Sequence, residues 1–264
     1  MKILCLTFPV VLLMLLSLPA SAAELVSLES RDGVEQKFIW VKPEAAKASV
    51  ILFAGGKGTL GLSSAFAMPS INWGKKNFLV RTRNLFAKNG FQVAVVDAPT
   101  DRQSSTGMLG GFRGSSDHVE DIDHVIRFLR AQENIPVWLI GTSRGTESAA
   151  NVAINSTEKP DGLVLTSSIT VESNKGTAIT EMELNKITIP TLIVANTDDK
   201  CLVTPAHGAD KIASMLGQAR LVKVKKFSGG DKPTSRPCEA MSYHGFTGIE
   251  KDVVGYIARF IKSN

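Results

Sequence analysis

Short apolar runs alternate along the chain with amphipathic segments, and this alternation constrains the fold more than any other feature. The runs have strand length, and between them apolar residues recur every three or four positions, which is the helical period. Strands that alternate with helices predict a mostly parallel sheet with helices on both faces. The predicted strands are residues 48–53, 91–96, 135–140, 162–165, 191–194 and 219–227, and the predicted helices are residues 77–88, 117–129, 144–154, 204–216 and 248–261.

The chain begins differently from this repeating pattern. Residues 24–30 and 36–41 are short and extended, with the turn Arg31-Asp32-Gly33 between them, so they predict an antiparallel hairpin ahead of the parallel strands. No repeat or low-complexity linker interrupts the rest. We therefore expect one α/β domain over residues 23–264, whose ligand site lies beyond the carboxyl ends of the parallel strands.

Residues 1–22 have the pattern of a secretory leader. Lys2 precedes an apolar stretch at residues 3–18, and Pro19-Ala20-Ser21-Ala22 ends the segment with small residues. An apolar core of this length is short for a spanning helix, so we expect cleavage rather than a retained membrane anchor. The prediction is a secreted or periplasmic protein with no stable membrane insertion after cleavage.

Charge and cysteine content exclude some other classes. Removal of Lys2 lowers the net charge from +5 to about +4, without a basic block of the kind that binds nucleic acid. The lysines at 223, 225 and 226 fit an edge strand guarded against pairing. Cys201 and Cys238 remain after the leader and predict either one disulfide or two buried thiols. Neither has metal-ligand spacing to a second Cys or His, so we expect no metal.

A G-x-S-x-G motif lies where the strand at 135–140 turns into the helix at 144–154. Its residues are Gly141-Thr142-Ser143-Arg144-Gly145. In such a turn the serine backbone is strained, and glycine two positions to either side lets strand and helix approach closely. The motif predicts Ser143 as a nucleophile, and the alternative is a serine that only caps the helix.

With this motif, the strand order and the later T-D-D and Y-H-G segments, the mature chain resembles an α/β-hydrolase. The resemblance implies a triad in the chain order serine, acid, histidine, and no cofactor. Only about 20 residues lie between Leu165 and Ile189, where lipases and many esterases of this superfamily insert a large helical lid, so we expect an open site.

The resemblance and the spacing of the histidines together indicate which one is the general base. His118 and His124 precede Ser143 on one helix, where Asp117 and Glu120 are placed as a capping pair, and we interpret both histidines as surface or helix-pairing residues. His207 lies only eight residues after the candidate acid. His244, in the loop before the last helix, is therefore the predicted general base.

The acid is expected after the strand at 191–194, where Asp198 and Asp199 are adjacent. We predict Asp199, with Asp198 as the alternative; its function is to orient and stabilise the imidazolium. A Cys201–Cys238 disulfide would link the acid loop to the base loop, or it would add stability without orienting either.

The oxyanion hole needs two N–H donors. Arg144, directly after Ser143, supplies the first, and we predict Gly56 or Lys57 for the second, in the glycine-rich loop after residues 48–53. The superfamily's common histidine-glycine start is absent from this loop. The alternative is a flexible turn without a donor.

The predicted function is hydrolysis of a small-molecule carboxylic ester through an acyl-enzyme. The alternatives are a small peptidase, a lactone or dienelactone hydrolase, or a secreted binding protein on a non-catalytic hydrolase scaffold. Residues 59–74 and 101–114 are candidate pocket walls or ordinary loops. An acidic substrate group would meet Arg102, Arg113 or Arg144, unless these arginines form surface ion pairs.

Overall fold

The computed structural model describes residues 23–65 and 68–264. The predicted leader at residues 1–22 lies outside the described residues, and so does Phe66 in one of the candidate pocket walls. None of the helices in the described part of the chain is both long and apolar enough to span a bilayer.

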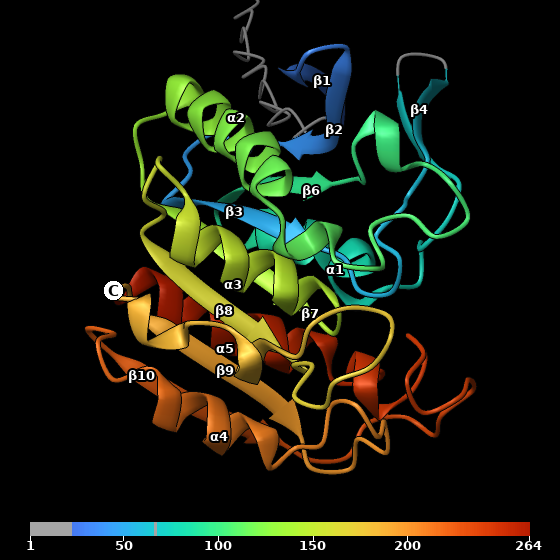
Figure 1. Cartoon of the computed structure of the whole chain (residues 1–264), viewed down its shortest axis with the longest axis vertical. Coiled ribbons are helices and arrows are strands. Elements are labelled where there is room, and N and C mark those ends of the chain that lie inside the picture. The colour runs from blue at the N-terminus through green and yellow to red at the C-terminus, as the bar shows by residue number, and fades with distance from the viewer. Residues whose placement is uncertain (1–22, 66–67) are drawn as a thin grey trace, which may run out of the picture.

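Eight strands of the described residues form the central sheet (Figure 1). They are β1 (Ala23–Arg31), β2 (Val34–Val41), β3 (Ala48–Phe53), β6 (Phe91–Val96), β7 (Val137–Thr142), β8 (Gly162–Thr166), β9 (Thr191–Asn196) and β10 (Val222–Phe227). Their order in the sheet is β1-β2-β6-β3-β7-β8-β9-β10. The hairpin β1–β2 is antiparallel and joins β6 in antiparallel fashion, and all further pairs are parallel.

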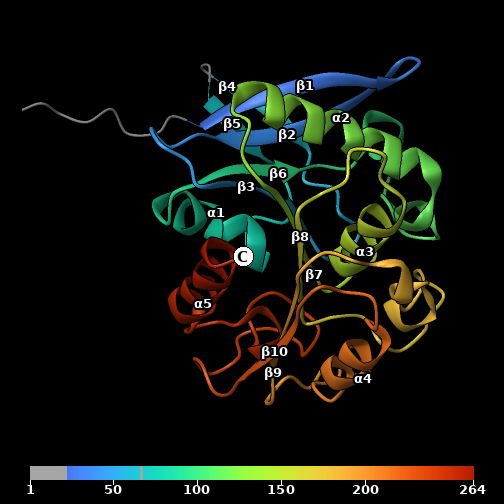
Figure 2. The same ribbon diagram turned by 90° about the vertical axis from the view of Figure 1, so that its left-hand side faces the viewer.

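Helices cover both faces of this sheet. They are α1 (Phe78–Lys88), α2 (Ser116–Gln132), α3 (Gly145–Asn155), α4 (Gly208–Met215) and α5 (Glu250–Lys262). Figure 2 shows α1 and α5 on one side of the sheet and α2, α3 and α4 on the other. A mostly parallel sheet between two helical layers, after an antiparallel hairpin, is the α/β-hydrolase architecture that the sequence predicts.

The alternation of side chains along each strand builds two cores. All six residues of β3 are buried; Val50 and Leu52 pack with α1 and α5, whereas Ile51 and Phe53 pack with α2 and α3. Burial of one such side chain is worth about 1.5–3 kcal/mol. Because both faces of β3 are buried, its sequence is a continuous apolar run instead of an alternation of apolar and polar residues.

Several boundaries differ from the sequence predictions. The helix expected over residues 204–216 is only Gly208–Met215, because Thr204 turns its side chain towards Asp199. The N-cap of α2 is Ser115, whose hydroxyl accepts a hydrogen bond from the His118 N–H, and not the Asp117/Glu120 pair. A separate two-stranded sheet, β4 (Leu62–Ala65) with β5 (Met68–Ile71), forms within residues 59–74 and was not predicted.

The edge-strand prediction is confirmed. β10 lies at one end of the sheet order, and the three lysines of residues 223–226 are on it.

The parallel strands β3, β7, β8 and β9 all have their carboxyl ends at the same edge of the sheet. The side chains of a ligand site are expected to meet at this edge.

Candidate active site

Ser143 lies in the turn between β7 and α3, with a strained backbone. Its φ is 53°, in the left-handed region that costs a non-glycine residue roughly 1–3 kcal/mol. Its N–H donates to the Thr166 carbonyl at 3.0 Å, and its carbonyl accepts from the N–H and the hydroxyl of Thr146. The turn therefore holds the serine in place from both sides.

The glycines of the motif are needed for close packing. A Cβ on Gly141 would lie 2.4 Å from the Gly145 carbonyl oxygen, and one on Gly145 would lie 2.1 Å from the Phe53 carbonyl oxygen. Either methyl group would push α3 away from β7 or β3. The close approach of strand and helix that the G-x-S-x-G motif predicts is therefore present at both glycines.

His244 and Asp199 form a buried pair. His244 Nδ1 lies 2.9 Å from Asp199 Oδ2, with side-chain exposures of 6% and 2%. The other carboxylate oxygen, Oδ1, accepts the N–H of Cys201 at 2.8 Å. An ionised carboxylate can only accept, so Nδ1 carries the proton in this pair and Nε2 is left with a free lone pair.

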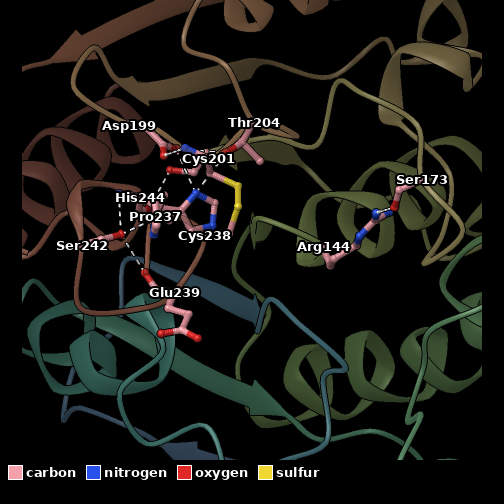
Figure 3. The surroundings of a disulfide bond; sticks show 11 residues. Arg144, Ser173, Asp199, Cys201, Thr204, Pro237, Cys238, Glu239, Ser242 and His244 are labelled. Carbon is pink, nitrogen blue, oxygen red and sulfur yellow. Dashed lines mark hydrogen bonds and ion pairs between the residues drawn. A yellow bond between two sulfur atoms is a disulfide. The ribbon is translucent and has the colours of Figure 1, made fainter. Parts of the chain in front are cut away.

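Thr204 is a third member of this group. Its hydroxyl donates to Asp199 Oδ2 at 3.0 Å and lies 3.1 Å from His244 Nδ1 (Figure 3). Thr204 was not predicted as a site residue, because its segment has the pattern of a helix start. A hydroxyl residue five positions after the acid, just ahead of Pro205, was the only available signal.

The two adjacent aspartates point to different partners. Asp198 Oδ2 accepts the N–H of Gly229 at 2.7 Å, in the loop after β10, whereas Asp199 contacts His244. His207, the other late histidine, is the N-cap residue of α4. Of the alternatives left open by the sequence, the structure pairs Asp199 with His244.

The loop that carries His244 is tied to the end of β8. The Ser167 hydroxyl donates to the His244 carbonyl at 2.8 Å, and Ser167 directly follows β8. In the sheet, β8 lies between β7, which leads to Ser143, and β9, which leads to Asp199. The turns that carry the three predicted triad residues therefore lie at one sheet edge, and among the described residues a hydrogen bond joins only Asp199 and His244 of the three. Within the described residues, the His244 ring hydrogen-bonds only through Nδ1, and the Ser143 hydroxyl forms no hydrogen bond.

The disulfide between Cys201 and Cys238 is formed, with a Cα–Cα distance of 4.6 Å. It joins the segment after Asp199 to the segment before His244, as Figure 3 shows. Ser242 closes the second segment, since its hydroxyl lies 2.8 Å from the carbonyls of both Pro237 and Glu239. Both loops that carry the acid–histidine pair are thus cross-linked.

The glycine-rich loop after β3 lies against Ser143. A Cβ on Gly55 would lie 2.9 Å from the Ser143 Cβ, which leaves no room for a side chain there. Among the described residues, the N–H groups of Gly56, Lys57 and Arg144 donate no hydrogen bond to the protein. These unpaired amides are therefore still candidates for the donors that the sequence predicts for an oxyanion hole.

A hollow of about 580 Å³ opens beside this loop. Its lining includes Trp73, Lys75, Lys76 and Glu239, besides the loop itself and Cys238. A larger hollow, of about 640 Å³, lies between α2 and α3 and is lined by none of the predicted site residues. The candidate oxyanion donors Gly56 and Lys57 form part of the wall of the smaller hollow, whereas Ser143, Asp199 and His244 are not among its lining residues.

The three candidate substrate-binding arginines lie elsewhere. Arg113 is fully buried, Arg144 bonds the Ser173 hydroxyl, and the Arg102 guanidinium lies 4.6 Å from the centre of the Phe112 ring. None of them lines the 580 Å³ hollow. In the part of the chain that the structure describes, no cluster of three or more His, Cys, Asp or Glu side chains could hold a metal ion.

Comparisons with known proteins agree with this architecture. A family model described as serine aminopeptidase, S33, matches residues 77–178, less than half of the chain. No curated protein is significantly similar to the chain in sequence.

Solved structures share the fold at low sequence identity. The esterase Pf2001 from Pyrococcus furiosus superposes with a TM-score of 0.65 and 13% identity over 92% of this chain and 91% of its own. A lidless α/β serine hydrolase from Xanthomonas campestris gives a TM-score of 0.60 and 14% identity over 92% and 94%. An acylaminoacyl peptidase from Pyrococcus horikoshii gives 0.62 and 16%, over 93% of this chain but 42% of its own.

Proposed function

We propose that this chain, which has the α/β-hydrolase fold, is a serine hydrolase of that superfamily and cleaves carboxylic esters through an acyl-enzyme. In this proposal Ser143 is the nucleophile, His244 the general base and Asp199 the acid. The observation that carries the proposal is the hydrogen bond between His244 Nδ1 and Asp199, located at the same sheet edge as the strained Ser143 turn.

In the first half of the reaction, the Ser143 hydroxyl oxygen attacks the ester carbonyl carbon while His244 Nε2 accepts the hydroxyl proton. The negative charge that develops on the carbonyl oxygen is stabilised by the N–H of Arg144 and by that of Gly56 or Lys57. The protonated imidazole, held by Asp199, then returns the proton to the leaving alcohol, and the acyl group stays on Ser143.

In the second half, water replaces the alcohol. Nε2 removes a proton from the water as its oxygen attacks the acyl carbon, and the same amides stabilise the second oxyanion. Collapse of this intermediate returns the proton to Ser143 and releases the carboxylic acid. No cofactor enters either half of the reaction.

An amide-cleaving activity is the second candidate, because the matched family model is described as an aminopeptidase and one structural neighbour is a peptidase. The charges beside the site favour the ester. Lys57, Lys75 and Lys76 line the hollow, and its one acid, Glu239, is already paired with Arg236. A substrate with a free, positively charged amino group would meet no unpaired carboxylate there.

Parallel assays separate these activities. We expect turnover of p-nitrophenyl acetate and butyrate and little turnover of aminoacyl p-nitroanilides. Faster cleavage of the anilides would replace the ester proposal by a peptidase, and preferential opening of a dienelactone would make the chain a lactone hydrolase.

A fluorophosphonate probe tests the nucleophile itself. We expect it to label the wild type and not Ser143→Ala, in which turnover falls up to about a million-fold. A wild type that neither labels nor turns over any of these substrates would leave the binding-protein alternative.

We also propose that residues 1–22 are removed on export and that residues 23–264 act outside the cytoplasm. The disulfide supports an oxidising compartment. N-terminal sequencing of the protein from a cell-envelope fraction and from the medium tests this: a mature chain that starts at Met1 would contradict cleavage.

A further inference from the structure

A buried arginine lies directly behind the glycine-rich loop. Arg113, in the short 3-10 helix η2 (Phe112–Gly114), is completely buried although it comes from a segment between β6 and α2. Its carbonyl accepts the side-chain N–H of Asn151 at 3.0 Å, so its backbone is anchored to α3. The mechanism proposed above leaves this cation unused.

The Arg113 side chain contacts the loop from its inner side. Nη2 donates to the carbonyls of Ala54 at 2.9 Å and of Gly56 at 3.3 Å, and Nη1 donates to the Ser148 hydroxyl at 2.6 Å. One guanidinium thus ties two peptide groups of the loop to the helix that follows Ser143.

These contacts fix the direction of particular amides. In a trans peptide the N–H of one residue points opposite to the carbonyl of the residue before it, and the described chain contains no cis peptide. Because the Gly56 carbonyl faces the buried guanidinium, the Lys57 N–H faces the opposite way. Lys57 is among the residues that line the 580 Å³ hollow. Lys57 is the candidate donor whose orientation Arg113 sets.

The loop leaves no space between itself and the cation. Gly58 has a φ of +76°, and a Cβ there would lie 2.6 Å from Arg113 Nη2 and 2.3 Å from the Met108 side chain. Burial lowers the pKa of Arg113 to about 10, against which the Glu147 carboxylate raises it, so the side chain remains charged at neutral pH. A buried charge is costly compared with apolar residues of similar volume, so packing alone does not account for it.

We propose that Arg113 is a positioning residue for the oxyanion hole: through the carbonyls of Ala54 and Gly56 it holds the glycine-rich loop with the Lys57 N–H directed at the reacting oxygen. This inference rests on the proposed function, since it assigns a task within the same site. It does not make Arg113 a catalytic residue, because the guanidinium touches neither substrate nor reacting atoms.

The decisive variant is Arg113→Met, which keeps an unbranched apolar stem in the buried position and removes the guanidinium donors. We expect kcat for p-nitrophenyl butyrate to fall about 10- to 100-fold, up to the loss seen when one oxyanion donor is removed, while KM changes less than about twofold. Affinity for an alkyl trifluoromethyl ketone, whose adduct carries the oxyanion, is expected to fall in parallel. All rates are expressed per site labelled by fluorophosphonate, so unfolded protein does not count.

Two further variants grade the effect. Arg113→Lys keeps the charge but cannot bond both carbonyls and Ser148 together, so it is expected to recover part of kcat. Ser148→Ala keeps the arginine and removes the acceptor of its Nη1. We expect kcat and ketone affinity to fall about two- to fivefold in this variant. It also tests the positioning role if Arg113→Met does not fold. Arg102→Met, in the neighbouring segment and partly exposed, is the matched control and is expected to retain wild-type kcat.

The outcomes separate this inference from the proposed function. A wild type that is not labelled and not active removes the proposed function. The positioning role alone is overturned if the wild type is labelled and active while Arg113→Met keeps its kcat and its ketone affinity. If Arg113→Met does not fold, unchanged kcat and ketone affinity in Arg113→Lys and Ser148→Ala overturn it in the same way. A loss of thermal stability at unchanged kcat per labelled site overturns it equally, since a merely structural residue would behave in this way.

Discussion

Two buried polar clusters lie near Ser143 and differ in how fully their side chains are paired. The acid–base cluster, Asp199, Thr204 and His244, has no buried side-chain atom without a partner among the described residues. The arginine cluster, Arg113, Arg144 and Glu147, leaves Arg113 Nε, Arg144 Nη1 and Glu147 Oε2 without hydrogen bonds. The closest approach of the last two atoms is 3.9 Å.

The incomplete pairing in the arginine cluster is accompanied by shifted pKa values of its charged groups. Burial lowers the pKa of Arg113 and Arg144 and raises the pKa of Glu147, so each charge in the arginine cluster is held at a cost. Figure 3 shows Arg144 turned towards Ser173, away from the disulfide and the acid–base cluster. In the proposed function, the acid–base cluster aligns the proton-transfer pair, and the arginine cluster holds backbone segments in place around it.

The largest effect is expected from the acid. Asp199→Asn should lower kcat roughly ten-thousand-fold, because the amide can donate to Nδ1 and so favours the wrong imidazole tautomer. Asp198→Asn is the matched control and should stay within a few-fold of the wild type. The Asp198 carboxylate accepts the Gly229 N–H, and the Asp198 N–H donates to the Asn196 side chain, so both printed contacts lie outside the acid–base cluster. Steady-state kinetics on p-nitrophenyl esters measure both; the reverse order would make Asp198 the acid.

The disulfide comes next. The double variant Cys201→Ser/Cys238→Ser should lose about 4 kcal/mol of unfolding free energy, as expected for a cross-link over a separation of 37 residues. Urea unfolding measures this loss. If the bridge also orients the acid–base cluster, kcat at a temperature where the variant is folded falls as well, and an unchanged kcat would show that it only stabilises.

His118, a buried residue near Arg113, is expected to make the free energy of unfolding depend on pH. It was expected at the surface or in helix pairing, but it is 1% exposed, its ring lies 6.0 Å from that of Phe53 and 5.6 Å from that of Phe112, and neither ring nitrogen has a partner among the described residues. Burial, with the charges of Arg113 and Arg31, lowers its pKa from 6.5 to about 3.

The folded protein therefore takes up this proton only near pH 3, whereas the unfolded chain takes it up near pH 6.5. Stability from this group is complete above pH 6.5 and is lost as the pH falls towards 3, by about 1.4 kcal/mol per unit. Between pH 7 and 4.5, wild type should lose roughly 3 kcal/mol more than His118→Phe in urea unfolding. His124→Phe is the control and should follow the wild type; equal losses in His118→Phe and the wild type would contradict the assignment.

The smallest effect on kcat is expected from Thr204, the third member of the acid–base cluster. Thr204→Val removes the hydroxyl that donates to Asp199, a hydrogen bond to a charged group worth about 1.5 kcal/mol, and should lower kcat about tenfold. Thr204→Ser retains the donor and should keep most of the activity. Equal losses in the two variants would mean that the methyl group, and not the hydroxyl, supports the site.

Much of the architecture was predictable because it depends on local periodicity. The strands at residues 48–53 and 91–96 have the predicted bounds, and the G-x-S-x-G motif marks the turn at Ser143 because only glycine tolerates the close approach of β7 and α3. Chain order and the small number of histidines then led to Asp199 and His244, which the structure places in contact.

Contacts between distant segments were not predictable in this way. Nothing around Arg113 in the sequence distinguishes a buried anchor from an ordinary loop residue, and the only signal for Thr204 is its place between the acid and Pro205. The start of α4 depends on the hydrogen bond from Thr204 to Asp199. The sequence by itself determined the elements, their order and the candidate triad, since repeating patterns and backbone sterics act over a few residues. The tertiary structure decided which polar groups are buried and paired, because burial depends on the neighbours that folding brings from elsewhere in the chain.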